Sequence, residues 1–150
     1  MREVKIYCDM DGVLVHQTGR DGFDQMPWAV DGRELWDYVK QFRPTILSQL
    51  SPDIYDRGRA QKRVWCDREL GRDVLLIVAR AWYYETAKYE YAEHGAVLID
   101  DHEEQHAAEW IARGGVFIHH QDARTTILKL KDMMQILAAR NYLDTEGFAA

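Results

Sequence analysis

The stretch Ile6-Tyr7-Cys8-Asp9-Met10-Asp11-Gly12-Val13-Leu14 decides the fold, because an apolar run ends there in two acids one residue apart. A short apolar run with β-branched residues, here Val4–Cys8, is typical of a buried strand. Gly12 allows the chain to turn sharply behind the acids. Side chains alternate along a strand, but in such a turn Asp9 and Asp11 can converge on one ion. An Asp-x-Asp-Gly sequence also occurs as a plain turn, so the rest of the chain must decide between the two interpretations.

Apolar runs and helical patterns alternate through the rest of the chain. The other expected strands are Thr45–Ser48, Val74–Ala79, Val97–Ile99 and Val116–Ile118. The expected helices are Gly32–Phe42, Gly58–Leu70, Glu103–Arg113 and Ala123–Arg140. Strands that are apolar on both faces and alternate with helices predict an α/β three-layer sandwich with a five-stranded parallel sheet. In such sheets, ligands bind beyond the carboxyl ends of the strands.

Two of these helices carry local signals. Asp31 is expected to cap the first helix, with Glu34 as its capping-box partner. In the second helix, Val64, Trp65 and Leu70 are expected to face the core. Around that helix, cations are mixed with acids; the cations are Arg57, Arg59, Lys62, Arg63, Arg68 and Arg72. This mixture is typical of a solvated helix face, and contact with a polynucleotide backbone is the alternative.

The composition fits one globular domain. Of the 150 residues, 47% are hydrophobic and 29% are charged, and we expect a domain over residues 1–140 followed by a tail over 141–150. The formal net charge of −6 argues against a generally basic nucleic-acid binder and a membrane-surface protein. No apolar segment has the length needed to span a bilayer. Cys8 and Cys66 are typical of buried thiols in a reducing compartment, so a cytoplasmic location is expected.

A second pair of acids, Asp100 and Asp101, follows the strand expected at Val97–Ile99. Because parallel strands end at the same edge of a sheet, up to four carboxylates are expected to gather at one point. Such carboxylates repel one another unless a hard cation lies between them, and oxygen-only ligands favour Mg²⁺. An EF-hand calcium loop does not match, because Gly12 is the fourth residue counted from Asp9 and that loop needs glycine at the sixth.

With these motifs in this order, the chain resembles the haloacid dehalogenase (HAD) superfamily of phosphohydrolases, which use an aspartate nucleophile. Tyr7–Leu14 is similar to the first motif, an apolar strand followed by D-x-D-G. Thr45–Ser48 is similar to the second, a strand that ends in Ser or Thr, and Val97–Asp101 to the fourth, a strand that ends in an acid pair. The resemblance spans residues 3–120 and is nearest to small phage or bacterial HAD hydrolases and deoxyribonucleotidases. The phosphatase part of polynucleotide kinase-phosphatases has a similar run.

The resemblance implies a role for each matching residue. Asp9 would attack phosphorus to form an aspartyl-phosphate, and Asp11 would protonate the leaving alkoxide and then activate water. Lys88 is assigned to the third motif, a lysine that offsets charge in the transition state, with Lys62 and Arg80 as competitors. The implied phosphate contacts are Ser48, Gln49 and Arg80. The implied Mg²⁺ site is formed by Asp9, Asp11, Asp100 and Asp101, with Asp11 contributing its backbone carbonyl and Asp101 supporting the metal shell.

The expected substrate contacts are less specific. HAD enzymes select substrates through cap insertions, and the segment His16–Val30 leaves no room for a cap domain. Phe23 and Trp28 within it would either stack on a nucleobase or anchor the loop on the core. After the third strand, three aromatic residues would touch substrate or pack in the core: Trp82, Tyr83 and Tyr84. His102 and His106 are spaced to share an ion, but no third ligand is indicated and exposure is expected.

We therefore expect an essentially capless, Mg²⁺-dependent phosphomonoester hydrolase that acts on nucleoside monophosphates or a similar small phosphate. The first alternative is a 3′- or 5′-end phosphatase acting on DNA or RNA. The second is a non-catalytic HAD-fold binding domain, although such a domain has no need to keep clustered buried charge. The expected partners are accordingly a small phosphorylated substrate or nucleic-acid ends, and no membrane.

Overall fold

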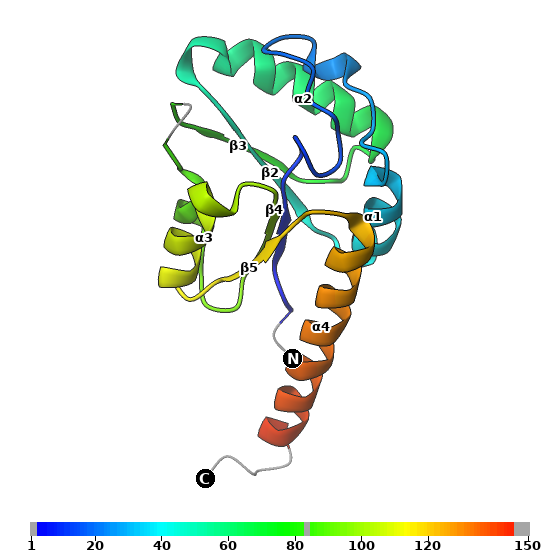
Figure 1. The fold of residues 1–150 in the computed structure, drawn as a ribbon, viewed down its shortest axis with the longest axis vertical. Coiled ribbons are helices and arrows are strands. Elements are labelled where there is room, and N and C mark those ends of the chain that lie inside the picture. The colour runs from blue at the N-terminus through cyan, green and yellow to red at the C-terminus, as the bar shows by residue number, and fades with distance from the viewer. Residues whose placement is uncertain (1–2, 83–84, 146–150) are drawn as a thin grey trace.

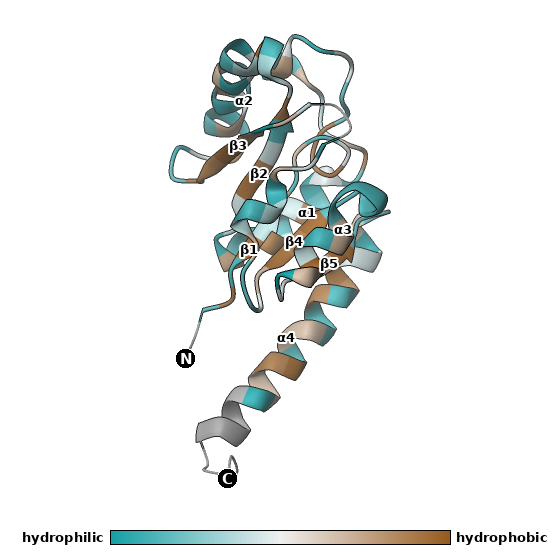
Figure 2. Cartoon of the chain, turned by 90° about the vertical axis from the view of Figure 1, so that its left-hand side faces the viewer, coloured by the Kyte–Doolittle hydropathy of each residue, from teal (hydrophilic) through white to brown (hydrophobic). Residues whose placement is uncertain are grey.

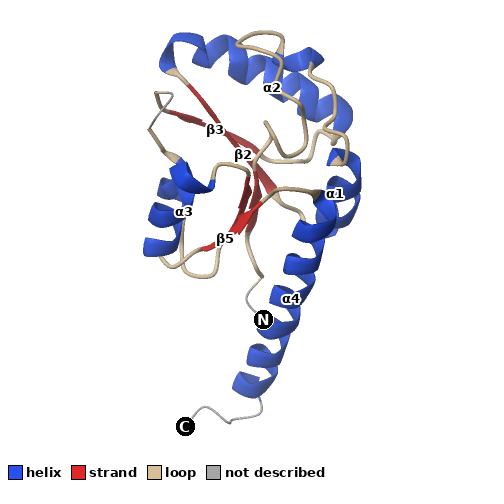
Figure 3. Ribbon diagram, in the orientation of Figure 1, coloured by secondary structure: helices blue, strands red, loops and turns tan. Residues whose placement is uncertain are grey.

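The fold is a parallel sheet between two layers of helices. The computed structural model describes residues 3–82 and 85–145. The strands are β1 (Ile6–Cys8), β2 (Thr45–Leu50), β3 (Leu76–Arg80), β4 (Val97–Asp100) and β5 (Val116–His119), in the order β3-β2-β1-β4-β5. The helices are α1 (Gly32–Val39), α2 (Tyr55–Glu69), α3 (Glu103–Ala112) and α4 (Ala123–Thr145). All four strand pairings are parallel, so the predicted α/β sandwich with a five-stranded parallel sheet is confirmed (Figure 3).

The two faces of the sheet bury different side chains because successive residues of a strand point to opposite sides. In β1, Ile6 and Cys8 pack into the larger core, on the side of α1, α2 and α4. Tyr7 points into the smaller core, where its ring lies 5.5 Å from that of Trp110 in α3. Helix α3 lies on the opposite side of the sheet from α1 and α4 (Figure 1). The apolar strands lie between more polar helices (Figure 2). This arrangement explains why the strands are rich in apolar residues on both faces.

Helix α2 differs from its predicted form. It begins at Tyr55 rather than Gly58, and Val64, which was expected to face the core, is 52% exposed. The buried positions of the helix are Gly58, Lys62, Trp65 and Cys66. These positions recur at helical spacing and therefore form one inward face that contains a lysine. The prediction of a fully solvated cationic face was wrong at Lys62 for this reason.

Asp31 was predicted to cap α1 with its side chain, but that side chain makes no capping hydrogen bond there. Instead, the Asp31 carboxylate accepts a hydrogen bond from the backbone N–H of Ala123, at 2.6 Å. Ala123 is the first residue of α4, whose first-turn N–H groups need acceptors. Asp31 therefore ties the start of α1 to the start of α4.

The segment between β1 and α1 lies against the core. Phe23 is only 1% exposed, and the indole N–H of Trp65 donates a hydrogen bond to the carbonyl of Met26 at 2.9 Å. The rings of Trp28 and Trp65 lie 5.0 Å apart. Of the two interpretations of Phe23 and Trp28, the structure favours the loop anchor. Within the described residues, this segment adds only the short 3-10 helix Phe23–Gln25 above the sheet edge.

Helix α4 extends away from the sheet (Figure 1). It continues through Thr145, past residue 140, where the domain was expected to end, and residues 146–150 of the expected tail lie outside the described part. None of the described helices has the length and apolar character needed to cross a bilayer. Cys8 and Cys66 are buried free thiols, as expected, and burial raises the pKa of Cys66 to about 11.

Candidate active site

The carboxyl ends of β1 and β4 lie side by side at the centre of the sheet. Cys8 pairs with Ile99, so Asp9 and Asp100 emerge next to each other. The chain leaves these neighbouring strands in opposite directions, β1 towards β2 and β4 towards β5, which makes this edge the switch point where parallel sheets bind ligands. Asp9 is 4% exposed and Asp100 is fully buried. Two carboxylates are therefore held together away from bulk water.

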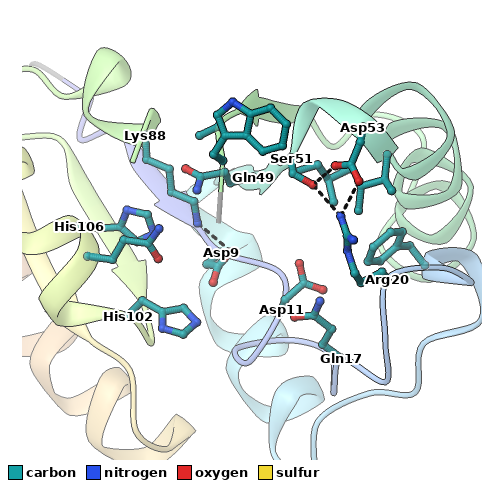
Figure 4. Close-up of a pocket in the computed structure, with 16 residues that line it drawn as sticks. Asp9, Asp11, Gln17, Arg20, Gln49, Ser51, Asp53, Lys88, His102 and His106 are labelled. Carbon is teal, nitrogen blue, oxygen red and sulfur yellow. Dashed lines mark hydrogen bonds and ion pairs between the residues drawn. The ribbon is translucent and has the colours of Figure 1, made fainter. Parts of the chain in front are cut away.

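Lys88 bridges these two carboxylates, and its contact with Asp9 is shown in Figure 4. Its ammonium lies 2.9 Å from Asp9 Oδ1 and 2.7 Å from Asp100 Oδ2, and the side chain is buried. Burial alone would lower the pKa of Lys88, but the charges of Asp9 and Asp100 outweigh it and raise that pKa above its ordinary value. Lys88 is thus a fixed positive charge between the ends of β1 and β4.

Gln49 holds the loop that carries Lys88. Its side-chain amide donates to the carbonyl of Glu85 at 2.8 Å and accepts from the N–H of Ala87 at 3.2 Å. Gln49, expected as a phosphate contact, lines the cavity, and its contacts in this structure position the lysine loop. Tyr83 and Tyr84 of this loop lie outside the described residues.

Asp101 completes a cluster that suits a cation. One ligand atom from each of Asp9, Asp100 and Asp101 lies within 4.8 Å of the others. Burial, followed by the charges of Asp9 and Asp100, raises the pKa of Asp101 to about 8. Among the described residues, the buried Oδ1 of Asp101 has no hydrogen-bond partner. Three crowded carboxylates with an unsatisfied oxygen fit a hard divalent cation such as Mg²⁺.

Gly12 leaves room for Asp101. Its φ is +80°, and a Cβ atom built on it would lie 2.1 Å from Asp101 Oδ2. Both the backbone conformation and the close approach therefore require glycine at this position. Gly12 thus forms the turn after Asp9 and Asp11 and also leaves space for the side chain of Asp101.

Replacing Gly12 with alanine should destabilise the fold by roughly 1–2 kcal/mol because of the positive φ. It should also weaken Mg²⁺ binding, since the carboxylate of Asp101 must move away from the new methyl group. Calorimetric titration and thermal unfolding with and without Mg²⁺ measure the two effects. Gly19→Ala is the matched control, because nothing lies within 4 Å of its added Cβ. Unchanged Mg²⁺ affinity in Gly12→Ala would remove Asp101 from the cation site.

Asp11 points to a different group of partners. Its Oδ2 accepts hydrogen bonds from the ammonium of Lys62 and, at 3.4 Å, from the Ser48 hydroxyl. Lys62 also donates to Ser48 Oγ at 2.6 Å, and its side chain is fully buried. The side chain of Asp11 does not belong to the cluster of three carboxylates. The sequence predicts that up to four carboxylates gather at one point. In the described residues, three of them cluster and the carboxylate of Asp11 lies apart.

Arg80, which was also expected to contact phosphate, lies outside the cavity. Arg80 stacks on the ring of Tyr55, 4.1 Å from its centroid, and lies 4.0 Å from Asp56 at the surface. It does not line the cavity, so the structure does not bring Arg80 to the other predicted residues. The reason is its position at the end of β3, two strands away from β1.

Two histidines of α3 border the carboxylates. His106 is 4% exposed, contrary to the expectation of exposure, and its Nδ1 is hydrogen-bonded to the Thr86 hydroxyl at 2.6 Å. Burial and the nearby charge of Lys88 lower the pKa of His106 to about 4, so the ring is neutral near pH 7. His102 Nε2 lies 3.8 Å from Asp101 Oδ2. The histidines flank the carboxylate cluster rather than form a metal site of their own.

A cavity of about 600 Å³ opens above these groups. Asp9, Asp11 and Lys88 line one side of the cavity. A second group of polar side chains lines the opposite side (Figure 4). In that group, Arg20 contacts Ser51 Oγ at 3.1 Å and Asp53 at 2.8 Å. No local pattern in the sequence predicts this contact, because it joins an irregular loop to a residue about thirty positions away. Trp82, which is 57% exposed, also lines the cavity.

The molecule is therefore an α/β protein with a Rossmann-like parallel sheet and a carboxylate–lysine cluster at its switch point. No protein-family model matches the chain, and no curated protein matches it. Among solved structures, it is similar to a chain in the structure of the Pnkp1/Rnl/Hen1 complex, with a TM-score of 0.51 and 14% sequence identity. The match covers 79% of this chain and 46% of the other, so the chain spans about half the length of its structural neighbour. At this level of identity, the likeness concerns the fold.

Proposed function

We propose that the protein is a Mg²⁺-dependent phosphomonoester hydrolase of the HAD type that forms an aspartyl-phosphate on Asp9. The observation that carries this proposal is the buried group in which Lys88 bridges Asp9 and Asp100 at the base of an open cavity. A structural ion pair has no need of the third carboxylate, Asp101, crowded against the first two. A phosphoryl group attacked by Asp9, together with a bound Mg²⁺, would account for the lysine and for all three carboxylates.

In this mechanism, a carboxylate oxygen of Asp9 forms a bond to phosphorus while the bond from phosphorus to the leaving oxygen breaks. Asp11 enters the reaction in its protonated form and gives that proton to the leaving oxygen. As the resulting carboxylate, paired with Lys62, it then takes a proton back from the water that hydrolyses the aspartyl-phosphate. Lys88 offsets the negative charge of the transferring phosphoryl group. Asp9, Asp100 and Asp101 would hold Mg²⁺, which supplies further positive charge for the phosphate oxygens. The contacts of Lys88 with Asp9 and Asp100 support its assignment as the third-motif lysine over Lys62 and Arg80.

The proposed substrate is a small, nucleotide-like phosphate. The exposed indole of Trp82 on the cavity wall supports this choice, because an aromatic face stacks well on a nucleobase. Phosphorylated DNA or RNA ends are the second candidate. This alternative is supported by the cavity mouth, over which the described residues place no separate domain.

The test is phosphate release by the purified chain from nucleoside monophosphates, sugar phosphates and 3′- or 5′-phosphorylated oligonucleotides. We expect turnover with Mg²⁺ that a chelator abolishes and added Mg²⁺ restores. Preference for the oligonucleotides would favour the second candidate. No release from any substrate, at any divalent cation concentration, would leave the non-catalytic binding domain as the better interpretation.

A further inference from the structure

Two buried lysines pair with acids at or next to the cavity. Lys88 pairs with Asp9 and Asp100, and Lys62 pairs with Asp11. Lys88 lines the cavity, whereas Lys62 is fully buried and does not. A ligand in the cavity can therefore contact Lys88, but Lys62 can influence it only through the residues that it holds.

The surroundings of Lys62 are specific. It lies on the inward face of α2 between Gly58 and Trp65, and its ammonium lies 4.9 Å from the centroid of the Phe23 ring. Its hydrogen-bond acceptors are Ser48 Oγ and Asp11 Oδ2. A buried ammonium costs several kcal/mol unless it is paired, and an apolar residue of similar size is often as stable at such a position. Fold stability alone therefore gives no reason for a lysine on this face of α2.

The two oxygens of Asp11 have different environments. Oδ2 accepts hydrogen bonds from both Lys62 and Ser48, whereas Oδ1 is buried and has no hydrogen-bond partner among the described residues. Asp11 lines the cavity, with 18% of its side chain exposed. Its side chain is also held apart from the three carboxylates that suit a cation. The contacts of Lys62 and Ser48 thus hold Oδ2 of Asp11 in place, while no contact within the described residues holds Oδ1.

We propose that Lys62 is a positioning residue: its contact with Oδ2 holds the Asp11 carboxyl beside the cavity, where Asp11 exchanges a proton with the leaving-group oxygen of the substrate. This inference rests on the proposed phosphohydrolase function. Lys62 also keeps the carboxylate of Asp11 from joining Asp9, Asp100 and Asp101. The four acids are thereby divided between cation binding and proton transfer.

The dependence on the leaving group separates this role from a purely structural one. An alkoxide needs a proton as it leaves, whereas p-nitrophenolate is stable as an anion and does not. A misplaced Asp11 therefore slows hydrolysis of an alkyl phosphate much more than hydrolysis of p-nitrophenyl phosphate. A general loss of folded protein lowers both rates by the same factor.

The experiment compares wild type with Lys62→Met on β-glycerophosphate and p-nitrophenyl phosphate, in Mg²⁺. We expect kcat to fall on the order of 100-fold or more for the alkyl ester, and only a few-fold for the aryl ester. KM should change little, because Lys62 does not reach the cavity. Arg59→Met, at an exposed position of the same helix, is the matched control and should resemble wild type on both substrates.

Lys62→Gln is the second variant, since it retains an N–H donor for Asp11 without the charge. Partial recovery of the alkyl-phosphate rate would support positioning. Equal losses on both substrates, unchanged rates on both, or failure of both variants to fold would overturn the inference while the wild-type activity still supports the proposed function. An inactive wild type would overturn the proposed function itself, and the inference with it.

Discussion

Asp9→Asn should reduce phosphate release by at least about 10⁴-fold, because the amide cannot attack phosphorus as a carboxylate does. The substitution conserves the size of the side chain, so the core around β1 should remain packed. Asp9 is nearly buried and contacts Lys88, which means that the amide also removes one of the two negative charges beside that ammonium, although its carbonyl oxygen can still accept a hydrogen bond. Rates for a generic aryl phosphate with Mg²⁺, measured beside the unfolding transition, provide the test.

A second readout for Asp9 does not depend on turnover. Acid quenching of the wild type during hydrolysis should trap a phosphorylated peptide that contains Asp9, and mass spectrometry should fail to find it in Asp9→Asn. Asp37→Asn, at an exposed position of α1, is the control for the change from acid to amide. A folded Asp9→Asn protein that works at the parental rate would show that another residue is the nucleophile.

Lys88→Met should lower kcat by roughly 10²- to 10⁴-fold, which is the range for a group that stabilises transition-state charge. It should also destabilise the cation-free protein by about 3–5 kcal/mol, because Asp9 and Asp100 would remain buried without a counter-charge. Mg²⁺ should restore part of that stability by supplying positive charge to the same carboxylates. Turnover and thermal unfolding, each with and without Mg²⁺, measure these effects.

Arg80→Met is the control for Lys88, since Arg80 lies at the surface on Tyr55 and outside the cavity. We expect it to retain nearly full activity. Lys62→Met should differ from both, with a loss that depends on the leaving group. If Arg80→Met were instead as impaired as Lys88→Met, the third-motif cation would have to be assigned again.

The sheet and its acids could be predicted because both follow from local sequence. An apolar run that ends in a polar residue indicates a buried parallel strand and its carboxyl end, which places Asp9, Asp100 and Ser48 at one edge. Lys88 was harder to assign, since its position depends on a loop fastened by Gln49. Such contacts between distant segments leave no periodic signal in the sequence.

Lys62 and Asp31 show where local signals mislead. The cations around α2 suggest a solvated helix, yet the spacing of Lys62 from Gly58 and Trp65 places it on the buried face. That spacing is the signal available in the sequence, and the expectation that Val64 faces the core together with Trp65 and Leu70 overlooks it. Asp31 precedes α1 in a typical capping position, but its carboxylate binds the start of α4. Competition from a distant N–H group cannot be seen from local sequence.

The adjacency of Ser48 and Gln49 on β2 has a consequence for heat inactivation. These neighbours point to opposite sides of the strand, one bonded to Lys62 and the other to the loop of Lys88. Two adjacent residues near the end of β2 therefore help to position both Lys62 and Lys88 relative to the sheet. Local fraying there would release the Lys88 loop from Gln49 and Lys62 from Ser48, leaving each ammonium held only by its carboxylates, so catalysis should fail at a lower temperature than the global melting of the protein.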